Sequence, residues 1–338
     1  MSLPITPIER LAWRQTPTFI KWDDRLSAGA GCSKWRLLDV VLPLMAEAGA
    51  DTLVCLASAG SSLVAASAYA CHQAAYSCHA LVRRQVASAG ARQAMNLGMT
   101  YGCHYHAAPD GVSLRSSSPW VLRFVDDLRA QGARPFLLPF GGTHPLAPRA
   151  YIAAGLELAS QVRQLEPKPK RVYVAAATGR LALGLAFGLA LAKSPLQVVA
   201  VGVSADTPAS AEAFETLLDE AFAAWTGDAP AVTAVLERLH VVNSSTSAAY
   251  GEASDAAQHA SALFVQHHNV ALDQTYAGRA FAALLADPEP ALFWCSGGTW
   301  QTPFTRPERD FADFLLPAMA EPALSASGGQ IENHVLVC

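Results

Sequence analysis

The sequence predicts an α/β fold of open, mostly parallel, twisted sheets that are covered by helices. Short apolar runs alternate with segments of helical period from Asp51 onward, and strand–helix repeats are typical of parallel sheets. The runs are apolar along their whole length, as expected for strands that are buried on both faces. Because 338 residues are too many for one small core, we expect two lobes or one large doubly wound sheet.

Seven apolar runs are the expected strands: 52–57, 77–82, 135–140, 171–176, 196–203, 239–242 and 291–296. Apolar stripes of helical spacing predict helices between them, most clearly at 120–128, 210–225 and 255–268. The stretch 166–171 is rich in proline and charge and resembles a linker. We therefore expect a larger lobe from residues 1–46 with 166–338, a smaller lobe from 47–165, and a site in the cleft between them.

Composition narrows the classes of partner. Hydrophobic residues make up 51% of the chain and charged residues 15%, which favours a globular protein over a disordered one. A formal net charge of -4, with no run of Lys or Arg, argues against nucleic-acid or membrane binding. No secretory leader pattern is visible, and the seven cysteines include no CxxC pair. We expect a cytoplasmic protein with reduced thiols and a small-molecule partner.

Two loops suggest chemistry on physical grounds. Thr178, Gly179 and Arg180 follow a strand and precede a helix, so backbone N–H groups there can converge on an anion. The alternative is an ordinary turn whose glycines serve packing. Lys34 follows a glycine-rich turn at the start of a predicted helix. Such a lysine can act as a nucleophile toward a carbonyl compound, or it can be a solvated surface lysine.

Six segments, taken in order, resemble the aminocyclopropane-carboxylate deaminase and D-cysteine desulfhydrase family. Residues 21–43 resemble its basic residue, acidic pair, glycine-rich turn and Lys-x-Arg helix, and residues 49–62 its substrate loop. The other matching segments are 132–162, the phosphate loop in 172–188, the Leu-Asp-x-x-Tyr-x-Gly segment in 272–284, and the strand and glycine pair in 291–299. The family consists of pyridoxal-phosphate (PLP) enzymes of fold type II, the tryptophan-synthase-β fold, so the resemblance implies both that fold and pyridoxal 5'-phosphate as the cofactor.

The resemblance also implies roles for individual residues. Lys34 would bind the cofactor covalently and move the α-proton of the substrate, and Tyr276 would lie over the cofactor and act on a substrate proton. Ser296 would lie beside the pyridine nitrogen. The cofactor phosphate would be bound by the loop residues Thr178, Gly179, Arg180 and Leu181. Two of these residues have structural alternatives that remain open. The alternative for Ser296 is a capping serine, and the alternative for Tyr276 is a hydrogen-bonded core tyrosine.

The substrate side departs from the family pattern. The loop implied to bind the substrate carboxylate contains Ser58, Gly60, Ser61 and Ser62, but it lacks the family's Gln-Ser-Asn run. Ser61 or Ser62 stands where the family resembled here has an asparagine, and Ser61 is a further candidate catalytic residue. His144 would contact substrate or only shape a turn. Trp35 and Trp300 flank the site loops, and Phe293 stands where deaminases of the family have a second tyrosine.

The implied reaction is α-proton abstraction followed by β-elimination from a small amino acid, of the C–S lyase or desulfhydrase type, giving an α-keto acid and ammonia. The alternatives are ring-opening deamination, β-replacement, racemisation, or a PLP-binding protein without turnover. A homodimer is implied by the resemblance. His104 and His106, like His267 and His268, are interpreted as surface or strand-face residues rather than metal ligands.

Overall fold

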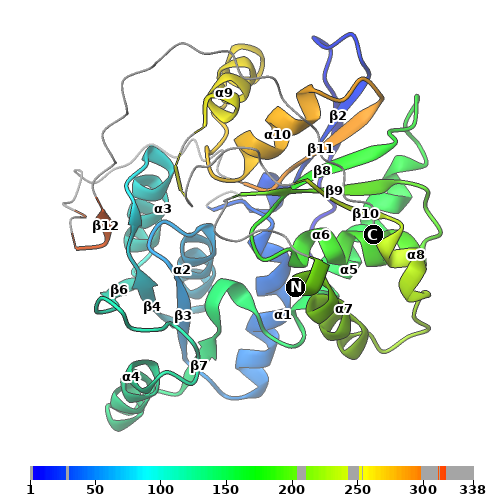
Figure 1. The fold of residues 1–338 in the computed structure, drawn as a ribbon. Helices are drawn as coiled ribbons and strands as arrows, with labels where there is room; N and C mark the ends of the chain where they lie inside the picture. The colour runs from blue at the N-terminus through cyan, green and yellow to red at the C-terminus, as the bar shows by residue number, and fades with distance from the viewer. Residues whose placement is uncertain are drawn as a thin grey trace.

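The computed structural model describes residues 3–27, 30–203, 211–242, 251–252, 254–297, 311 and 313–316. Within them, the strands form a six-stranded sheet in the order β1-β2-β11-β8-β9-β10, a four-stranded sheet in the order β6-β4-β3-β7, and a short β12-β5 pair (Figure 1). Apart from the β1–β2 pair, the strand pairs named here are parallel. The predicted α/β class with mostly parallel sheets is confirmed.

The larger sheet is covered by helices on both faces. Its strands are β1 (Ile8–Arg10), β2 (Thr18–Trp22), β11 (Ala291–Cys295), β8 (Arg171–Ala176), β9 (Gln197–Gly202) and β10 (Leu239–Val242). One face packs against α5 (Ala147–Val162), α6 (Arg180–Leu191) and α7 (Ala211–Ala224), and the other against α9 (Asp255–His268) and α10 (Ala277–Leu285). Val174 faces the first group and Tyr173 the second, which explains why the strand is apolar throughout.

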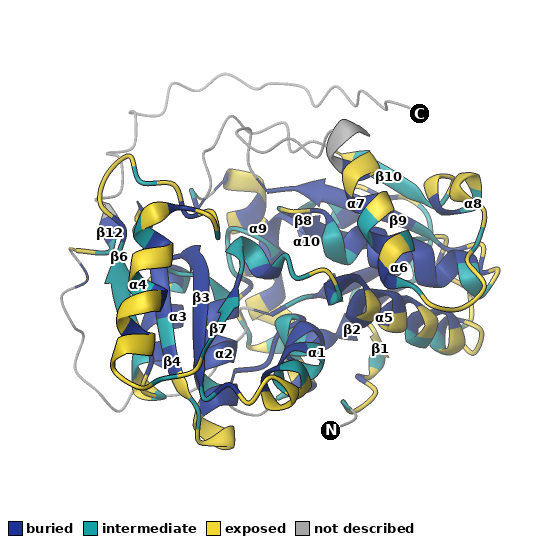
Figure 2. Cartoon of the chain, turned by 90° about the horizontal axis from the view of Figure 1, so that it is seen from below, coloured by how far each residue is buried: buried dark blue, intermediate teal, exposed yellow. Residues whose placement is uncertain are grey.

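The smaller sheet has the same layered arrangement. Its strands are β6 (His104–Ala107), β4 (Ser77–Arg83), β3 (Thr52–Ser58) and β7 (Pro135–Leu138). Helices α1 (Lys34–Glu47), α2 (Ser62–Ala74) and α3 (Ala89–Thr100) contribute to the core on one face, and α4 (Pro119–Ala130) covers the other. In Figure 2 most of β3 and β4 is buried, β6 and β7 are mostly of intermediate burial, and the outer face of α4 is exposed. The short elements are η1 (Asp23–Leu26), β5 (Gln85–Val86), η2 (Phe140–Gly142), α8 (Val232–Leu236) and β12 (Leu315–Leu316).

Every expected strand is present, as β3, β4, β7, β8, β9, β10 and β11, and the three helical stripes form α4, α7 and α9. Strands β1, β2, β5, β6 and β12 were not predicted. Helix α5, which the predicted boundary assigns to the smaller lobe, contributes Ile152 and Leu158 to the core of the larger sheet. The division into lobes remains a prediction, and we propose that the smaller lobe ends before α5. Among the described helices, none is long and apolar enough to cross a membrane.

Candidate active site

A cavity of about 740 Å³ lies beyond the carboxyl ends of strands from both sheets, where parallel sheets bind ligands. Its size falls within the roughly 300–1,000 Å³ of pockets that hold drug-sized ligands. Most of the predicted site residues line this one cavity: Lys34, Ser58, Gly60, Ser61, Ser62, Thr178, Gly179, Arg180, Leu181, Tyr276 and Ser296. Five segments that are far apart in the sequence therefore converge where the sequence predicted a site.

Three of the singled-out residues lie elsewhere, and a fourth, Trp300, lies outside the described residues. His144 is not among the lining residues; its ring stacks on Phe136, and its Nδ1 accepts a hydrogen bond from the Leu146 N–H (3.2 Å). The Trp35 indole donates to the Ala30 carbonyl (2.9 Å), and Phe293 is fully buried in the core beneath α10. The structure therefore gives His144 and Trp35 contacts within the fold rather than with the cavity.

Lys34 begins α1, and the residue before it is fixed to the end of β11. The Ser33 N–H donates to the Ser296 carbonyl (2.8 Å), and the Ser33 hydroxyl accepts from the Trp294 indole N–H (3.0 Å). Cys32 pairs with Gly297, whose φ of 131° and close approach to the Cys32 side chain leave no room for a Cβ. These contacts therefore fix the positions of Lys34 and Ser296 relative to each other, although 262 positions separate them in the sequence.

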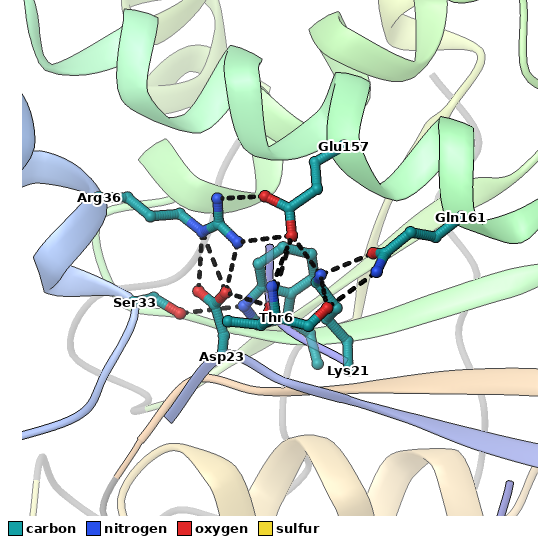
Figure 3. A network of polar contacts seen from close by, with 8 residues as sticks. Thr6, Lys21, Asp23, Ser33, Arg36, Glu157 and Gln161 are labelled. Carbon is teal, nitrogen blue, oxygen red and sulfur yellow. Dashed lines mark hydrogen bonds and ion pairs between the residues drawn. The ribbon is translucent and has the colours of Figure 1, made fainter. Parts of the chain in front are cut away.

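A buried network of ion pairs and hydrogen bonds lies next to Ser33 and holds the start of α1 in place (Figure 3). The Arg36 guanidinium, on the first turn of α1, pairs with Asp23 of η1 and with Glu157 of α5. Glu157 also pairs with Lys21, a fully buried residue of β2. Lys21 further donates to the Gln161 side chain and to the Thr6 carbonyl, both at 2.6 Å. Because each buried charge has a partner, the network fixes α1 relative to both β2 and α5.

The predicted phosphate loop has the geometry of an anion-binding site. Gly179 is the N-cap of α6 with φ +74°, and a Cβ there would lie 2.9 Å from the Phe214 ring. The first N–H groups of α6 have no intrahelical partner and point out of the helix N-terminus. The Arg180 guanidinium does not point freely into the cavity, because Nη2 pairs with both oxygens of Glu220 on α7 (2.9 and 2.7 Å). The loop thus offers backbone donors, with the Arg180 side chain anchored at its edge.

Asp273 holds the segment that carries Tyr276. Its carboxylate accepts hydrogen bonds from the backbone N–H groups of Thr275 (3.1 Å), Tyr276 (2.7 Å) and Ala277 (3.0 Å) at the start of α10. Burial raises the pKa of Asp273, and these N–H groups partly offset that effect. Asp273 therefore acts as a cap that fixes the backbone of Tyr276 at the cavity wall.

The structure adds two residues to the site that the sequence did not indicate. Gln85, after β4, accepts a hydrogen bond from the Gly60 N–H (3.0 Å), and Arg83 Nε donates to the Ser58 hydroxyl (3.1 Å). Both line the cavity. Their only signal in the sequence was their place directly after an expected strand, at the edge where ligands bind.

Comparisons with known proteins agree with this arrangement. The family model of pyridoxal-phosphate-dependent enzymes matches residues 3–291. The chain belongs to this family. A nocardicin C-9' epimerase of Nocardia uniformis subsp. tsuyamanensis is 35% identical over 87% of this chain and 89% of the relative. A D-cysteine desulfhydrase of Salmonella paratyphi B is 27% identical over 83% of this chain and 86% of the relative.

Solved structures of family members share the fold. An aminocyclopropane-carboxylate deaminase homologue superimposes with a TM-score of 0.69 at 20% identity, covering 87% of this chain and 89% of that one. A PLP-dependent aspartate racemase does so with a TM-score of 0.56 at 15% identity, covering 88% of this chain and 92% of that one. The predicted family, fold type II and PLP dependence are confirmed, and the chain is an enzyme of this family.

Proposed function

We propose that Lys34 binds the cofactor covalently and moves the α-proton of an amino acid, and that β-elimination follows. The observation that carries this proposal is the convergence of Lys34, the N-terminus of α6 and Ser296 on one cavity. The site fits pyridoxal phosphate: Gly179 shapes a cradle for the phosphate, Lys34 supplies the amine, and Ser296 supplies a hydroxyl for the ring nitrogen. When bound, the cofactor withdraws electrons from the α-carbon and so acidifies its proton.

The chain's own residues would then direct the reaction. The Lys34 amine takes the α-proton. The contacts of Ser33 with Ser296 and Trp294 hold Lys34 in place for this step. Ser296 is a neutral hydroxyl that does not protonate the ring nitrogen strongly, which favours departure of a β-substituent over storage of charge in the ring. The α C–H and β C–X bonds break, the leaving group departs with its electron pair, and hydrolysis of the resulting enamine gives an α-keto acid and ammonia.

A second candidate reaction is epimerisation or racemisation, which shares the first step. The relative at 35% identity, named an epimerase, favours it. In this case the proton returns to the other face of the α-carbon from a second group, for which the hydroxyls of Tyr276 and Ser61 are the candidates that line the cavity. A homodimer, implied by the family resemblance, and a cytoplasmic location, expected from the sequence, remain predictions.

The test starts with borohydride reduction of the purified holoenzyme and peptide mapping of the adduct, which we expect on Lys34. The enzyme is then incubated with D- and L-amino acids in D₂O, where exchange of the α-proton reports the shared first step. Release of keto acid identifies elimination, whereas chiral chromatography identifies epimerisation. Lys34→Ala should abolish the adduct and the exchange; an adduct on another lysine, or exchange unchanged in Lys34→Ala, would refute the assignment.

A further inference from the structure

Two described side chains of the cavity wall carry a buried polar atom that has no hydrogen-bond partner. They are Arg180, through Nε, and Gln274, through Oε1. The Arg180 donor lies in the predicted phosphate loop, where an anion is expected. The Gln274 oxygen is an acceptor, and no expected role of the site supplies it with a donor. Because a buried acceptor without a donor costs roughly 1–3 kcal/mol, its presence in a cavity wall calls for an explanation.

The segment that contains Gln274 is held by other contacts. The Ser261 hydroxyl accepts from the Leu272 N–H and donates to the Leu272 carbonyl, both over 3.1 Å. Asp273 accepts from three backbone N–H groups at the start of α10. Gln274 adds a bond from Nε2 to the same Leu272 carbonyl, but at 3.5 Å it is longer than an ordinary hydrogen bond. The Gln274 amide can therefore contact a ligand at little cost to the fold.

The long bond to Leu272 decides which end of the Gln274 amide is available. With Nε2 beside the Leu272 carbonyl, Oε1 is left for another group, because the reversed amide would bring two carbonyl oxygens together. The last torsion of a glutamine side chain has broad preferences, so a small rotation turns Oε1 from the wall toward a bound molecule. Gln274 thus offers an acceptor, which pairs with O–H and N–H groups but not with an apolar group or a carboxylate.

The cavity wall next to Gln274 leaves room for a substrate side chain. Gly90, on the first turn of α3, lies close to Asp273, since a Cβ on Gly90 would be 4.0 Å from the Asp273 Cβ. The other α3 residues near it that line the cavity, Ala89 and Ala91, are also small. At about 740 Å³, the cavity lies in the upper part of the range for pockets that hold drug-sized ligands. A side chain larger than a methyl group can therefore extend beside the cofactor toward this wall.

We propose that Gln274 binds the side chain of the substrate through Oε1. It would thereby select amino acids whose side chain carries a hydroxyl or N–H donor over apolar amino acids of the same size. This proposal rests on the proposed function, because it requires that the cavity receives an amino acid. The substrate class is then an amino acid with a polar, hydrogen-bond-donating side chain.

The test compares amino acids of nearly equal shape, threonine with valine and asparagine with leucine, each as the D and L forms. Binding to the holoenzyme is measured from the change in cofactor absorbance. In at least one pair the wild type should bind the polar amino acid more tightly than the apolar one. In Gln274→Met, which keeps the length of the side chain but has no carbonyl oxygen, we expect the ratio of the apolar to the polar Kd to fall about tenfold. Because the free amino acids are the same for both proteins, their different hydration cancels in this comparison.

Gln258→Met removes an exposed glutamine of α9 and is the matched control, expected to keep the wild-type ratio. A wild type that prefers no polar amino acid, or an unchanged ratio in Gln274→Met, would overturn the proposal while leaving the proposed function intact. An equal loss of affinity for both members of every pair would also overturn it, because it would indicate a structural role.

The two proposals can fail separately. If the absorbance of the wild type responds to no amino acid of either configuration, the proposed function fails and the role of Gln274 fails with it. Should Gln274→Met lose its cofactor band, Gln274→Asn takes its place, since it withdraws the oxygen by one methylene. A lowered ratio in Gln274→Asn supports the role of Oε1, and an unchanged ratio refutes it.

Discussion

Glu157→Gln tests whether the buried network stabilises the fold through its charges. The Glu157 carboxylate pairs with Arg36 (2.9 Å) and with Lys21, which is fully buried. The substitution leaves those two cations opposite Asp23 alone. Removing one partner of a buried pair costs roughly 3–5 kcal/mol. Because glutamine keeps an acceptor oxygen and the Glu157 side chain is 15% exposed, we expect the lower end, about 3 kcal/mol.

That loss converts into a measurable shift in melting temperature. An unfolding entropy of about 2.1 cal/mol/K per residue gives roughly 0.7 kcal/mol/K for 338 residues. The variant should therefore melt about 4 °C below the wild type. Thermal unfolding near neutral pH, monitored by far-UV circular dichroism, measures this shift. Glu289→Gln is the matched control, since its partner Lys170 is 61% exposed and a surface pair contributes less than about 1 kcal/mol. Equal shifts in the two variants would refute the reasoning.

The pH dependence gives a second check on the same variant. Burial alone would raise the pKa of Glu157, but the hydrogen bonds and charges of Arg36 and Lys21 outweigh it and leave the pKa below its usual value of 4.5. A carboxyl group with a lowered folded-state pKa stabilises the fold above its unfolded pKa, and this stability is lost as the pH falls through the folded value. The difference in unfolding free energy between the wild type and Glu157→Gln should be largest above pH 4.5 and should decrease below it. A gap that is constant across this range would contradict the assignment.

Two further predictions concern the cavity and the smaller sheet. Gly179→Ala forces a Cβ to within 2.9 Å of Phe214 at φ +74°, so we expect the Kd for pyridoxal phosphate in a spectroscopic titration to rise about tenfold, whereas an unchanged Kd would argue against the cradle. Burial and the neighbouring His106 and His104 lower the pKa of His79 to about 4, so the NMR titration of its ring should show a midpoint well below 6.5. Its folded state resists protonation, so stability should fall as the pH drops from 6.5 toward 4, and a ring that titrates near 6.5 would refute this.

Strands and loops that follow the periodicity rules could be predicted from the sequence. Strands such as β8 and β9 are apolar on both faces because helices cover both, and that pattern is local. The loop at Gly179 was also predictable, since a strand, a small-residue turn and a helix follow one another directly. The ordered set of six weak motifs then identified the family, although each alone is consistent with a simple turn.

What the sequence did not reveal depends on contacts between distant residues. Strand β2 contains Lys21, and a lysine is expected to be exposed when no partner is known. Its partner Glu157 lies 136 positions later in the sequence, so the burial of Lys21 could not be predicted. The place of Arg83 on the cavity wall likewise depends on the pairing of β4 with β3. His144 follows Gly141 and Gly142, whose φ values of +69° and +80° turn the chain, so Gly141 lines the cavity and the His144 ring stacks on Phe136 instead. Neither backbone turns nor distant ion pairs leave a periodic signal.

The place of β2 between β1 and β11 has a consequence for synthesis of the protein. Thr18 pairs with Ala291, so 273 residues must be made after β2 before its parallel partner exists. At roughly 5–20 residues per second, that takes about 14 to 55 s, during which one edge of β2 is unpaired. Lys21, directed inward on this strand, is a charge of the kind that discourages pairing with foreign strands. The Lys21 charge, which in the folded protein helps to fix α1 through Glu157, would thus first protect the nascent chain from aggregation.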